Sequence, residues 1–280
     1  PLAVMVPDVS FLKDLTETEI TLLTSTAAPI VLLAKHKVPS LAEQIAPQLN
    51  EIGVMLPSNP LQHLLLREVN RPLVMTSANP SGQPPVLDNQ SAVEYLSDLA
   101  DYFLCHNRDI LQRADDSLVR AAFDGVETLR RARGYVPDET LLDHQSAHNV
   151  LALGSDLKNT FCLLRQNKAI VSQHIGDTSN EKVRSQLEAN IALFCQIYQF
   201  KPELIAIDSH AGYFTHEAGK RLAAQYEIPY MEVLHHHAHI VSVMAEHHCH
   251  EQVIGLALDG IGMGENGQLW GGECLLVDEK

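Results

Sequence analysis

The 280-residue sequence has no Cys-x-x-Cys pair, and its 5 cysteines are scattered along the chain. An odd and unpaired set disfavours a disulfide framework and a four-cysteine zinc site, and it indicates a reducing setting. The sequence also contains no apolar run long enough to span a bilayer and no signal-peptide pattern. We therefore expect a cytoplasmic protein that has no membrane among its partners.

Basic and aromatic residues are scarce. The chain has 20 lysines and arginines against 35 aspartates and glutamates, a net charge of -15, and 5% aromatic residues. This acidic balance disfavours nucleic acid as a partner unless arginines concentrate on one face. The length and the 45% hydrophobic content support one large or two ordinary domains with proper cores.

In the first half of the chain, short apolar runs alternate with polar helical stretches, a pattern that predicts an α/β domain. We expect a helix from Asn59 onwards, a helix at Ala92–Ala100, a strand at Tyr102–Cys105 and a hairpin near Leu118–Arg130. The polar stretch Pro137–Asn149 is typical of a linker. Earlier strands are expected at Leu2–Val6, Ile30–Leu33, Glu51–Leu56 and Leu73–Thr76.

Two features of the first half are candidates for binding a phosphate or an acyl group. Ser77 and Asn79 lie two positions apart, so in extended chain they face the same way and offer a hydroxyl and an amide. Arg130, Arg131 and Arg133 cluster beside a glycine, and guanidinium groups pair bidentately with phosphate oxygens. Both patterns also have a structural interpretation: serine and asparagine are common in turns, and the arginines could pair with this chain's many carboxylates.

The second half starts a new α/β pattern. Expected strands at Val150–Leu153, Thr160–Leu164 and Ala169–Ser172 are followed by helix, strand, helix, strand and helix. This order resembles the half-unit of the actin and sugar-kinase-like (ribonuclease H-like) fold, in which two halves clasp a nucleotide. Residues Val253–Val277 match the opening hairpin of the second half of that fold.

A histidine cluster precedes this hairpin. His235 and His239 lie four positions apart on an expected helix, so their imidazoles share one face and can bind one metal ion. Asp259, at the end of the expected strand Val253–Leu258, can be directed at the same point. The alternative is a solvated helix start that binds metal only adventitiously. We favour that interpretation for the nearby His247, His248 and His250.

The histidine cluster does not match the helix motif of zinc proteases. That motif places a glutamate, the general base, directly after the first histidine, and this position is His236. No hydrolytic base is supplied, so a function other than proteolysis is expected.

Several specific motifs follow one another along the chain: Gly53-Val-Met-Leu-Pro57, Thr76-Ser-Ala-Asn79, Asp115-Asp-Ser117, Arg130-Arg-Ala-Arg-Gly-Tyr-Val-Pro137, Ser172-Gln-His-Ile-Gly-Asp177, His235-His-His-Ala-His239 and Leu258-Asp-Gly-Ile-Gly-Met-Gly264. In this order they resemble the HypF family of carbamoyltransferases, which mature nickel–iron hydrogenases. The resemblance covers essentially the whole chain. It implies a YrdC-like domain with a twisted mixed sheet in residues 1–140 and a TsaD-like domain in residues 141–280.

The resemblance also implies that the chain is a piece of a longer protein. The YrdC-like domain would lack its N-terminal part, and the TsaD-like domain would contain the first lobe and the opening hairpin of the second lobe. The family's acylphosphatase-like domain, its Cys-x-x-Cys zinc fingers and a basic Lys-x-Arg motif are not found. We therefore expect that this chain alone cannot complete the reaction from carbamoyl phosphate.

The chemistry implied by the resemblance has two stages. The YrdC-like domain would join carbamate, derived from carbamoyl phosphate, to ATP (with Mg²⁺) to give carbamoyl-adenylate. The TsaD-like domain would then transfer the carbamoyl group to the C-terminal cysteine of the partner HypE, for cyanide ligand synthesis.

Matching motif positions assigns roles to individual residues. Ser77 and Asn79 would be catalytic and hold the carbamate or the α-phosphate. His235, His239 and Asp259 would bind one zinc or iron ion that polarises the carbamoyl carbonyl as a Lewis acid. The nucleotide would be bound by Ser117, Arg131, Arg133, Asp156, Lys158, Gly262, Gly264, Gly271 and Gly272.

Three other functions remain open at this stage. A tRNA threonylcarbamoyl-type enzyme has the same two modules, but the net charge of -15 disfavours it. A small-molecule O-carbamoyltransferase with both modules is closer. A non-catalytic scaffold that binds metal or nucleotide is the third alternative.

Overall fold

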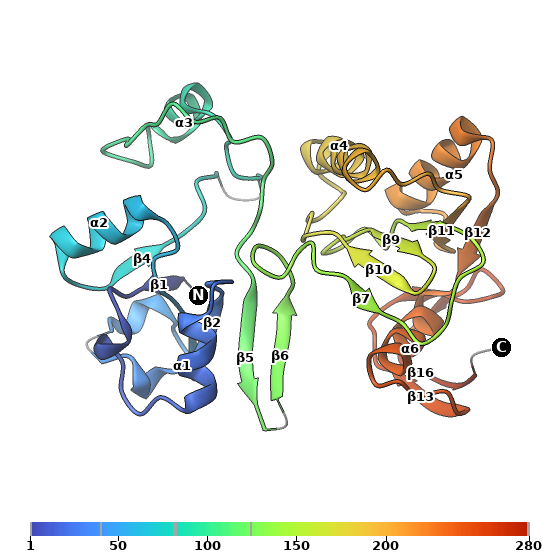
Figure 1. Ribbon diagram of the computed structural model, residues 1–280, viewed down its shortest axis with the longest axis horizontal. Coiled ribbons are helices and arrows are strands. Elements are labelled where there is room, and N and C mark those ends of the chain that lie inside the picture. Colours follow the sequence, from blue (N-terminus) through green and yellow to red (C-terminus); the bar gives the residue numbers. More distant parts are fainter. Residues whose placement is uncertain (1, 40, 81–82, 124, 279–280) are drawn as a thin grey trace. The chain divides into compact units, whose positions relative to one another are not determined.

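The computed structural model describes residues 2–39, 41–80, 83–123 and 125–278, and it divides into two compact units, Pro1–Val136 and Pro137–Lys280 (Figure 1). Each unit contains a six-stranded sheet with both parallel and antiparallel neighbours, together with helices. The predicted α/β class is confirmed. No helix in the described part of either unit is long and apolar enough to cross a membrane.

The sheet of unit 1 has the strand order β4-β1-β3-β2-β5-β6. Strand β1 is parallel to β3 and β2 is parallel to β5, whereas the other neighbours are antiparallel. The strands are β1 Ala3–Met5, β2 Ile30–Ala34, β3 Glu51–Met55, β4 Leu73–Met75, β5 Leu118–Ala122 and β6 Gly125–Arg130. The α-helices are α1 Glu17–Thr24, α2 Pro60–Val69 and α3 Asn89–Leu96, and 3₁₀ turns span Val9–Phe11, Lys35–Lys37 and Glu43–Ile45.

Alternating burial explains why the central segments of unit 1 form strands. In β2, Val31 and Leu33 are fully buried while their neighbours are less so, as expected when successive side chains point to opposite faces. These two residues pack with Leu22 and Leu23 of α1 in the main core of the unit. The core therefore lies between the sheet and α1.

Helix α1 begins with a reciprocal capping box. The amide of Glu19 donates to Thr16 Oγ1 (3.2 Å), and the Glu19 carboxylate accepts from the amide of Thr16 (2.7 Å). Lys37 Nζ donates to the same carboxylate at 2.7 and 2.8 Å. Burial, the largest influence, raises the pKa of Glu19, but the hydrogen bonds from Lys37 and Thr16 together lower this pKa below its ordinary value of 4.5.

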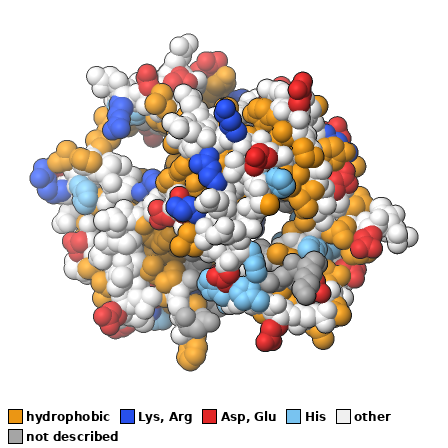
Figure 2. Space-filling view, turned by 45° about the vertical axis from the view of Figure 1, so that its right-hand side comes forward, with side chains coloured by type: hydrophobic (Ala, Val, Ile, Leu, Met, Phe, Trp, Pro, Cys, Tyr) orange, Lys and Arg blue, Asp and Glu red, His pale blue; other side chains and the backbone are white. Residues whose placement is uncertain are grey.

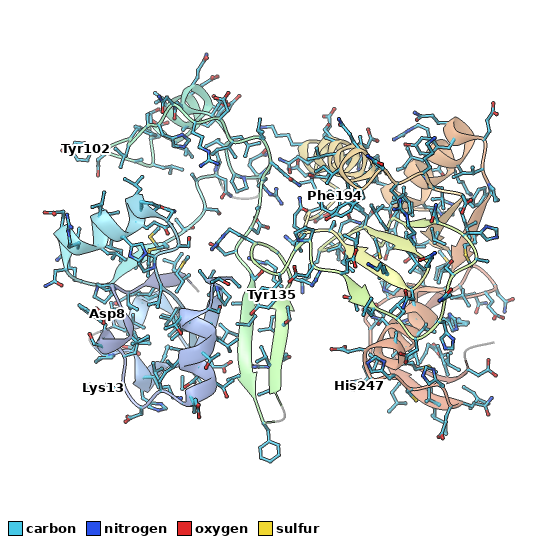
Figure 3. All side chains as sticks on the ribbon, in the orientation of Figure 1. Asp8, Lys13, Tyr102, Tyr135, Phe194 and His247 are labelled. Atoms are coloured by element: carbon cyan, nitrogen blue, oxygen red, sulfur yellow. The ribbon has the colours of Figure 1, made fainter. Side chains whose placement is uncertain are left out.

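At the end of unit 1, the predicted helix is confirmed with different bounds, and one predicted strand is wrong. Helix α3 spans Asn89–Leu96 rather than Ala92–Ala100, because Asp88 caps it by accepting from the amide of Ser91 at 2.8 Å. The predicted strand Tyr102–Cys105 does not form, and within the described residues it pairs with no other strand. Tyr102 is 92% exposed, and Figure 3 shows its side chain at the surface. An apolar run without a pairing partner cannot satisfy its backbone as a strand.

The sheet of unit 2 has the strand order β12-β11-β8-β9-β10-β7. The predicted succession of antiparallel strands is confirmed in β8, β9 and β10, and β11 is parallel to both β8 and β12. The strands are β7 Thr140–Leu141, β8 Val150–Ala152, β9 Cys162–Arg165, β10 Lys168–Val171, β11 Leu204–Asp208 and β12 Tyr230–Val233. The helices are α4 Glu181–Ile197, α5 Phe214–Tyr226 and α6 His235–Glu246.

The linker interpretation of Pro137–Asn149 is wrong for its central part. Strand β7 pairs antiparallel with β10, with Leu141 opposite Lys168. A two-residue edge strand has no periodicity to read, so the sequence pattern alone could not show it.

Two small hairpins follow α6. Strand β13 (Val253–Ala257) pairs antiparallel with β16 (Glu273–Val277), and β14 (Gly262–Met263) pairs with β15 (Leu269–Trp270). Ile240 and Met244 of α6 pack with Ala257 and Val277 in a separate small core. This contact fixes the loop after β13 against the helix that begins with the histidine cluster.

The parallel strands of unit 2 determine where its polar side chains gather. Strands β8, β11 and β12 run in the same direction, so their carboxyl ends meet at one edge of the sheet. Strand β11 ends at Asp208, and β12 is followed by Leu234 and the first residue of α6, His235. Ligands of open α/β sheets bind at such edges.

We predict that the charged Glu19 carboxylate stabilises the fold and that this stabilisation is lost in acid. Because the pKa of Glu19 is lowered in the folded state, its contribution to the free energy of unfolding is fully present above pH 4.5 and is lost as the pH falls through the folded-state pKa. Urea unfolding of Glu19→Gln should therefore differ most from that of the native chain near neutral pH, and the two should converge in acid. Glu17→Gln, an exposed change on the same helix, is the control. A difference that persists unchanged in acid contradicts the prediction.

Candidate metal centre

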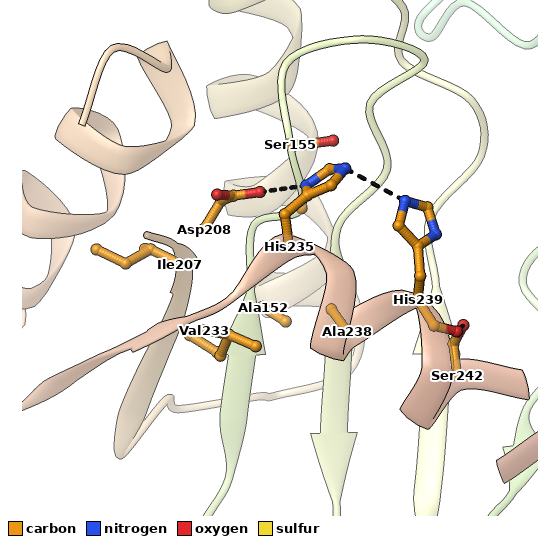
Figure 4. Close-up of a pocket in the computed structure, with 11 residues that line it drawn as sticks. Ala152, Ser155, Ile207, Asp208, Val233, His235, Ala238, His239 and Ser242 are labelled. Atoms are coloured by element: carbon orange, nitrogen blue, oxygen red, sulfur yellow. Dashed lines mark hydrogen bonds and ion pairs between the residues drawn. The ribbon is translucent and has the colours of Figure 1, made fainter. Parts of the chain in front are cut away.

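Three ligand-type side chains of unit 2 converge on one point: His235, His239 and Asp259, with one ligand atom of each within 4.8 Å of the others. His235 Nε2 lies 2.9 Å from Asp259 Oδ2 and 3.2 Å from His239 Nε2, and His239 Nε2 lies 3.6 Å from Asp259 Oδ2. The two histidines are one helical turn apart on α6, and Figure 4 shows their ring nitrogens joined by a dashed line, with the ring planes nearly perpendicular. The structure thus brings together the three residues that the sequence pattern associates.

Asp208 holds His235 from the other side. Its Oδ2 lies 2.7 Å from His235 Nδ1, and its Oδ1 accepts from the amide of His210 at 2.9 Å. The Asp208 side chain is 7% exposed, so both oxygens are held in place within the protein. When Nδ1 of His235 donates its proton to Asp208, the lone pair of Nε2 points at the cluster.

The sequence pattern alone did not identify Asp208 as a site residue. The signal that could have identified it is its place at the end of a strand, one strand before the strand that leads into the histidine helix. The ends of neighbouring parallel strands meet at one edge of a sheet, but the strand order is known only from the structure.

The Asp259 carboxylate is favoured in its charged form. Burial, the largest influence, raises its pKa, but the amide of Gly260 and the neighbouring His235 and His239 outweigh burial and lower this pKa below its ordinary value of 3.8. The Gly260 amide donates to Oδ1 at 2.7 Å. This bond leaves Oδ2 directed at the two histidines.

A cavity of about 290 Å³ lies beside the cluster at the strand edge (Figure 4). It is lined by apolar side chains such as Ile207 and Val233 and by the polar Ser155, Asp208 and His235. A second cavity of about 330 Å³ lies between α6 and the loop after β13, and it shares His239 and Ser242 with the first. The converging ligands are thus open to small molecules on both sides of His239.

Gly262 and Gly264, which were assigned to the nucleotide, are buried against aromatic rings. A Cβ atom at Gly262 would lie 2.5 Å from the ring of His236, and one at Gly264 would lie 2.1 Å from the ring of Trp270. These contacts give both glycines a packing role that the sequence analysis did not anticipate. The other two glycines of that set, Gly271 and Gly272, are exposed.

Asp156 and Lys158 occupy different surroundings. Both carboxylate oxygens of Asp156 accept from the start of α5, from the amides of Phe214 (2.9 Å) and Thr215 (3.1 Å). Asp156 therefore caps this helix. Lys158 is exposed.

In unit 1, the Ser77 hydroxyl donates to Asn79 Oδ1, so the two side chains lie together. Ser77 is exposed and Asn79 is half-buried. Both side chains can be reached by a small ligand.

Ser117 and Arg133 make hydrogen bonds and an ion pair with other residues of unit 1. Ser117 is fully buried; its hydroxyl accepts from the amide of Ala132 (2.8 Å) and donates to the carbonyl of Arg133 (3.0 Å). The Arg133 guanidinium pairs with Asp116 at 2.5 Å, which matches the structural alternative for the arginines. Arg131 is half-buried.

Family models match nearly the whole chain. One described as the HypF Kae1-like domain matches residues 145–246, and one described as the second subdomain of the carbamoyltransferase Kae1-like domain matches residues 255–280. A model described as telomere recombination, named for Sua5, YciO and YrdC, matches residues 1–132.

Individual relatives agree with these models. Carbamoyltransferase HypF2 of Cupriavidus necator is 45% identical over 99% of this chain and 37% of its own length. Carbamoyltransferase HypF of Synechocystis is 43% identical over 93% of this chain and 34% of its own length. The chain thus spans a little over a third of the length of the curated relatives it matches.

Solved structures show the same relationship. A crystal structure of full-length HypF in a phosphate- and nucleotide-bound form is 43% identical and has a TM-score of 0.91, over 99% of this chain and 44% of that one. The structure of T. kodakarensis HypF is 41% identical with a TM-score of 0.90, over 99% of this chain and 37% of that one. The chain therefore belongs to the HypF family of carbamoyltransferases, as its ordered motifs predict.

Proposed function

We propose that this chain contributes to ATP-dependent carbamoyl transfer in hydrogenase maturation. Unit 1 joins carbamate to ATP, which releases diphosphate and gives carbamoyl-adenylate. Unit 2 transfers the carbamoyl group to the C-terminal cysteine sulfur of HypE, which loses its proton, and AMP leaves. The observation that carries the proposal is the convergence of His235, His239 and Asp259 beside a cavity in a chain of the HypF family.

The residues of the candidate centre fit a zinc or iron ion. Two imidazole nitrogens and one carboxylate oxygen form a donor set that both metals accept, and three protein ligands leave a position for substrate. Without a cation or shared protons, their lone pairs would repel one another at the 2.9–3.6 Å separations found here. A bound ion would polarise the carbamoyl carbonyl as a Lewis acid.

The protein's own groups prepare this site. Asp208 fixes the ring and tautomer of His235, and the amide of Gly260 orients Asp259. The cavity lined by Ser155, Asp208 and His235 is where part of the nucleotide would lie. A HypF relative of known structure is in a phosphate- and nucleotide-bound form, which supports nucleotide binding within this family.

In unit 1, the accessible Ser77 and Asn79 hold the carbamate or the α-phosphate by hydrogen bonds. Arg131 supplies positive charge to the phosphates. Ser117 and Arg133 act indirectly, because their hydrogen bonds join the segment before β5 to the segment after β6.

We predict that His239→Ala loses the ion of this centre, one zinc per chain, and weakens ATP binding while the fold is retained. His239 is exposed, so its removal opens no core cavity. Metal analysis after dialysis against zinc, together with calorimetric titration of ATP, measures both effects. His247→Ala, the exposed residue at the end of the same helix (Figure 3), is the matched control. Full metal content in His239→Ala would show that the ligand assignment is wrong.

A second prediction concerns Asp208. Loss of a carboxylate that holds a ligating histidine typically costs about 10- to 100-fold in metal affinity. Asp208→Asn should therefore bind zinc that much more weakly, with an unchanged circular dichroism spectrum. Glu217→Gln, an exposed carboxylate change in the first turn of α5, should leave the affinity unchanged. Equal zinc affinities of Asp208→Asn and the native chain would contradict the positioning role.

The transfer step is tested with HypE as acceptor. Because this chain alone is not expected to complete the reaction, HypE is incubated with a full-length HypF protein that carries these residues, together with ATP, Mg²⁺ and carbamoyl phosphate, and the mass of HypE is measured. We expect the mass of one carbamoyl group to be added at the C-terminal cysteine, and we expect His239→Ala in that protein to abolish the addition. Unmodified HypE after incubation with the metal-loaded full-length protein contradicts the proposed function.

A further inference from the structure

A second group of histidines in unit 2 surrounds a single carboxylate. We refer to Asp143, His144, His248 and His250 as the Asp143 cluster. All four side chains are exposed, and the two pairs are separated by more than a hundred residues of sequence. Histidine side chains gather next to acidic ones on the face shown in Figure 2. From the sequence, His248 and His250 were expected to be solvated residues that bind metal only adventitiously.

The contacts within the Asp143 cluster are close. His248 Nδ1 lies 2.8 Å and His250 Nε2 lies 2.9 Å from the same oxygen, Asp143 Oδ2. On the far side of His250, Nδ1 lies 3.2 Å from His144 Nε2, and the two rings meet edge to face. Two imidazole nitrogens thus contact the same carboxylate oxygen, and the three side chains offer the same types of ligand atom as the candidate metal centre.

The backbone holds both sides of the cluster in place. After β7, the amide of Leu142 donates to the carbonyl of Asn167 (2.8 Å), and the amide of Ser146 donates to that of Gln166 (2.9 Å). These bonds tie the segment that carries Asp143 and His144 to the turn before β10.

The turn after α6 holds the other side. His248 has a left-handed backbone (φ 52°), and the amide of Cys249 donates to the carbonyl of Met244 at 2.9 Å. Cys249 packs against the small core formed by α6 and the β13–β16 hairpin. The inward-facing Cys249 leaves His248 and His250 on either side of it, directed at the surface.

Charge also favours a cation at this place. Asp143 supplies a carboxylate oxygen in a chain with a net charge of -15. Divalent transition metals select such combinations of imidazole and carboxylate.

We propose that the Asp143 cluster is a second metal site, which binds a divalent transition-metal ion such as zinc through Asp143, His248 and His250. Ligand atoms around a tetrahedral zinc ion lie about 3.3 Å apart. Because all three side chains are exposed, they can rotate to this spacing from their present 2.8 and 2.9 Å contacts with Asp143 Oδ2.

His144 completes the arrangement as a positioning residue. A ligating histidine commonly donates its second ring N–H to a fixed acceptor, and Nδ1 of His250 faces Nε2 of His144. The bound ion joins the segment after β7 to the turn after α6. It would therefore stabilise unit 2 by a route separate from the candidate metal centre.

The experiment removes the first site before the second is measured. In His235→Ala/His239→Ala, calorimetric titration with zinc should still show one bound ion per chain. Adding His248→Ala/His250→Ala to this variant should remove the zinc binding. Adding the isosteric Asp143→Asn alone to the same variant should weaken the zinc binding at least about tenfold. His144→Ala should also weaken it about 10- to 100-fold. Adding the neighbouring change His247→Ala instead should leave it unchanged.

Thermal unfolding gives an independent measurement. Zinc should raise the midpoint of His235→Ala/His239→Ala, because an ion that binds only the folded state stabilises it, and the rise should disappear with His248→Ala/His250→Ala. If the first variant binds zinc no more tightly than the variant that lacks all four histidines, the Asp143 cluster is only a set of surface hydrogen bonds and the proposal is overturned. This result would leave the function proposed for the first site unaffected.

Discussion

The hydrogen bond between Asp208 and His235 is the interaction on which the candidate metal centre depends. It joins the end of β11 to the first residue of α6, two elements that the parallel sheet places side by side. By accepting a hydrogen bond from Nδ1–H, Asp208 directs Nε2 of His235 toward Asp259 and His239. The helix then supplies His239 one turn later, and the packing of α6 on the β13–β16 hairpin supplies Asp259. Each ligand is thus positioned by a different part of the fold.

Local sequence rules predicted the features that depend on neighbouring residues only. The spacing of His235 and His239 on one helix face, and the alternation of strands with helices, follow from periodicity alone. The same rules failed where the interacting partner comes from a distant segment of the chain. The apolar run at Tyr102 found no neighbouring strand, and the two-residue strand β7 exists only because β10 lies beside it. The contacts of Asp208 and Asp143 likewise depend on strand order and on turns that a sequence pattern does not show.

The glycines and the buried serine illustrate a second reason for differences. By motif position, the family resemblance assigned Gly262 and Ser117 to nucleotide binding. The structure shows a ring against Gly262 and two backbone partners on Ser117. A small residue needed for close packing and one needed for ligand access look the same in a sequence. Family membership therefore supports the overall chemistry more firmly than it supports the role of each small residue.

The central claim is that His235, His239 and Asp259 form one metal centre held by Asp208. Anomalous diffraction from a zinc-loaded crystal tests it most directly, because it locates the ion without reference to activity. The account predicts an ion at about 2.0–2.2 Å from Nε2 of both histidines and from a carboxylate oxygen of Asp259, with Asp208 still bonded to Nδ1 of His235. An ion that leaves these three side chains unbound would contradict the account.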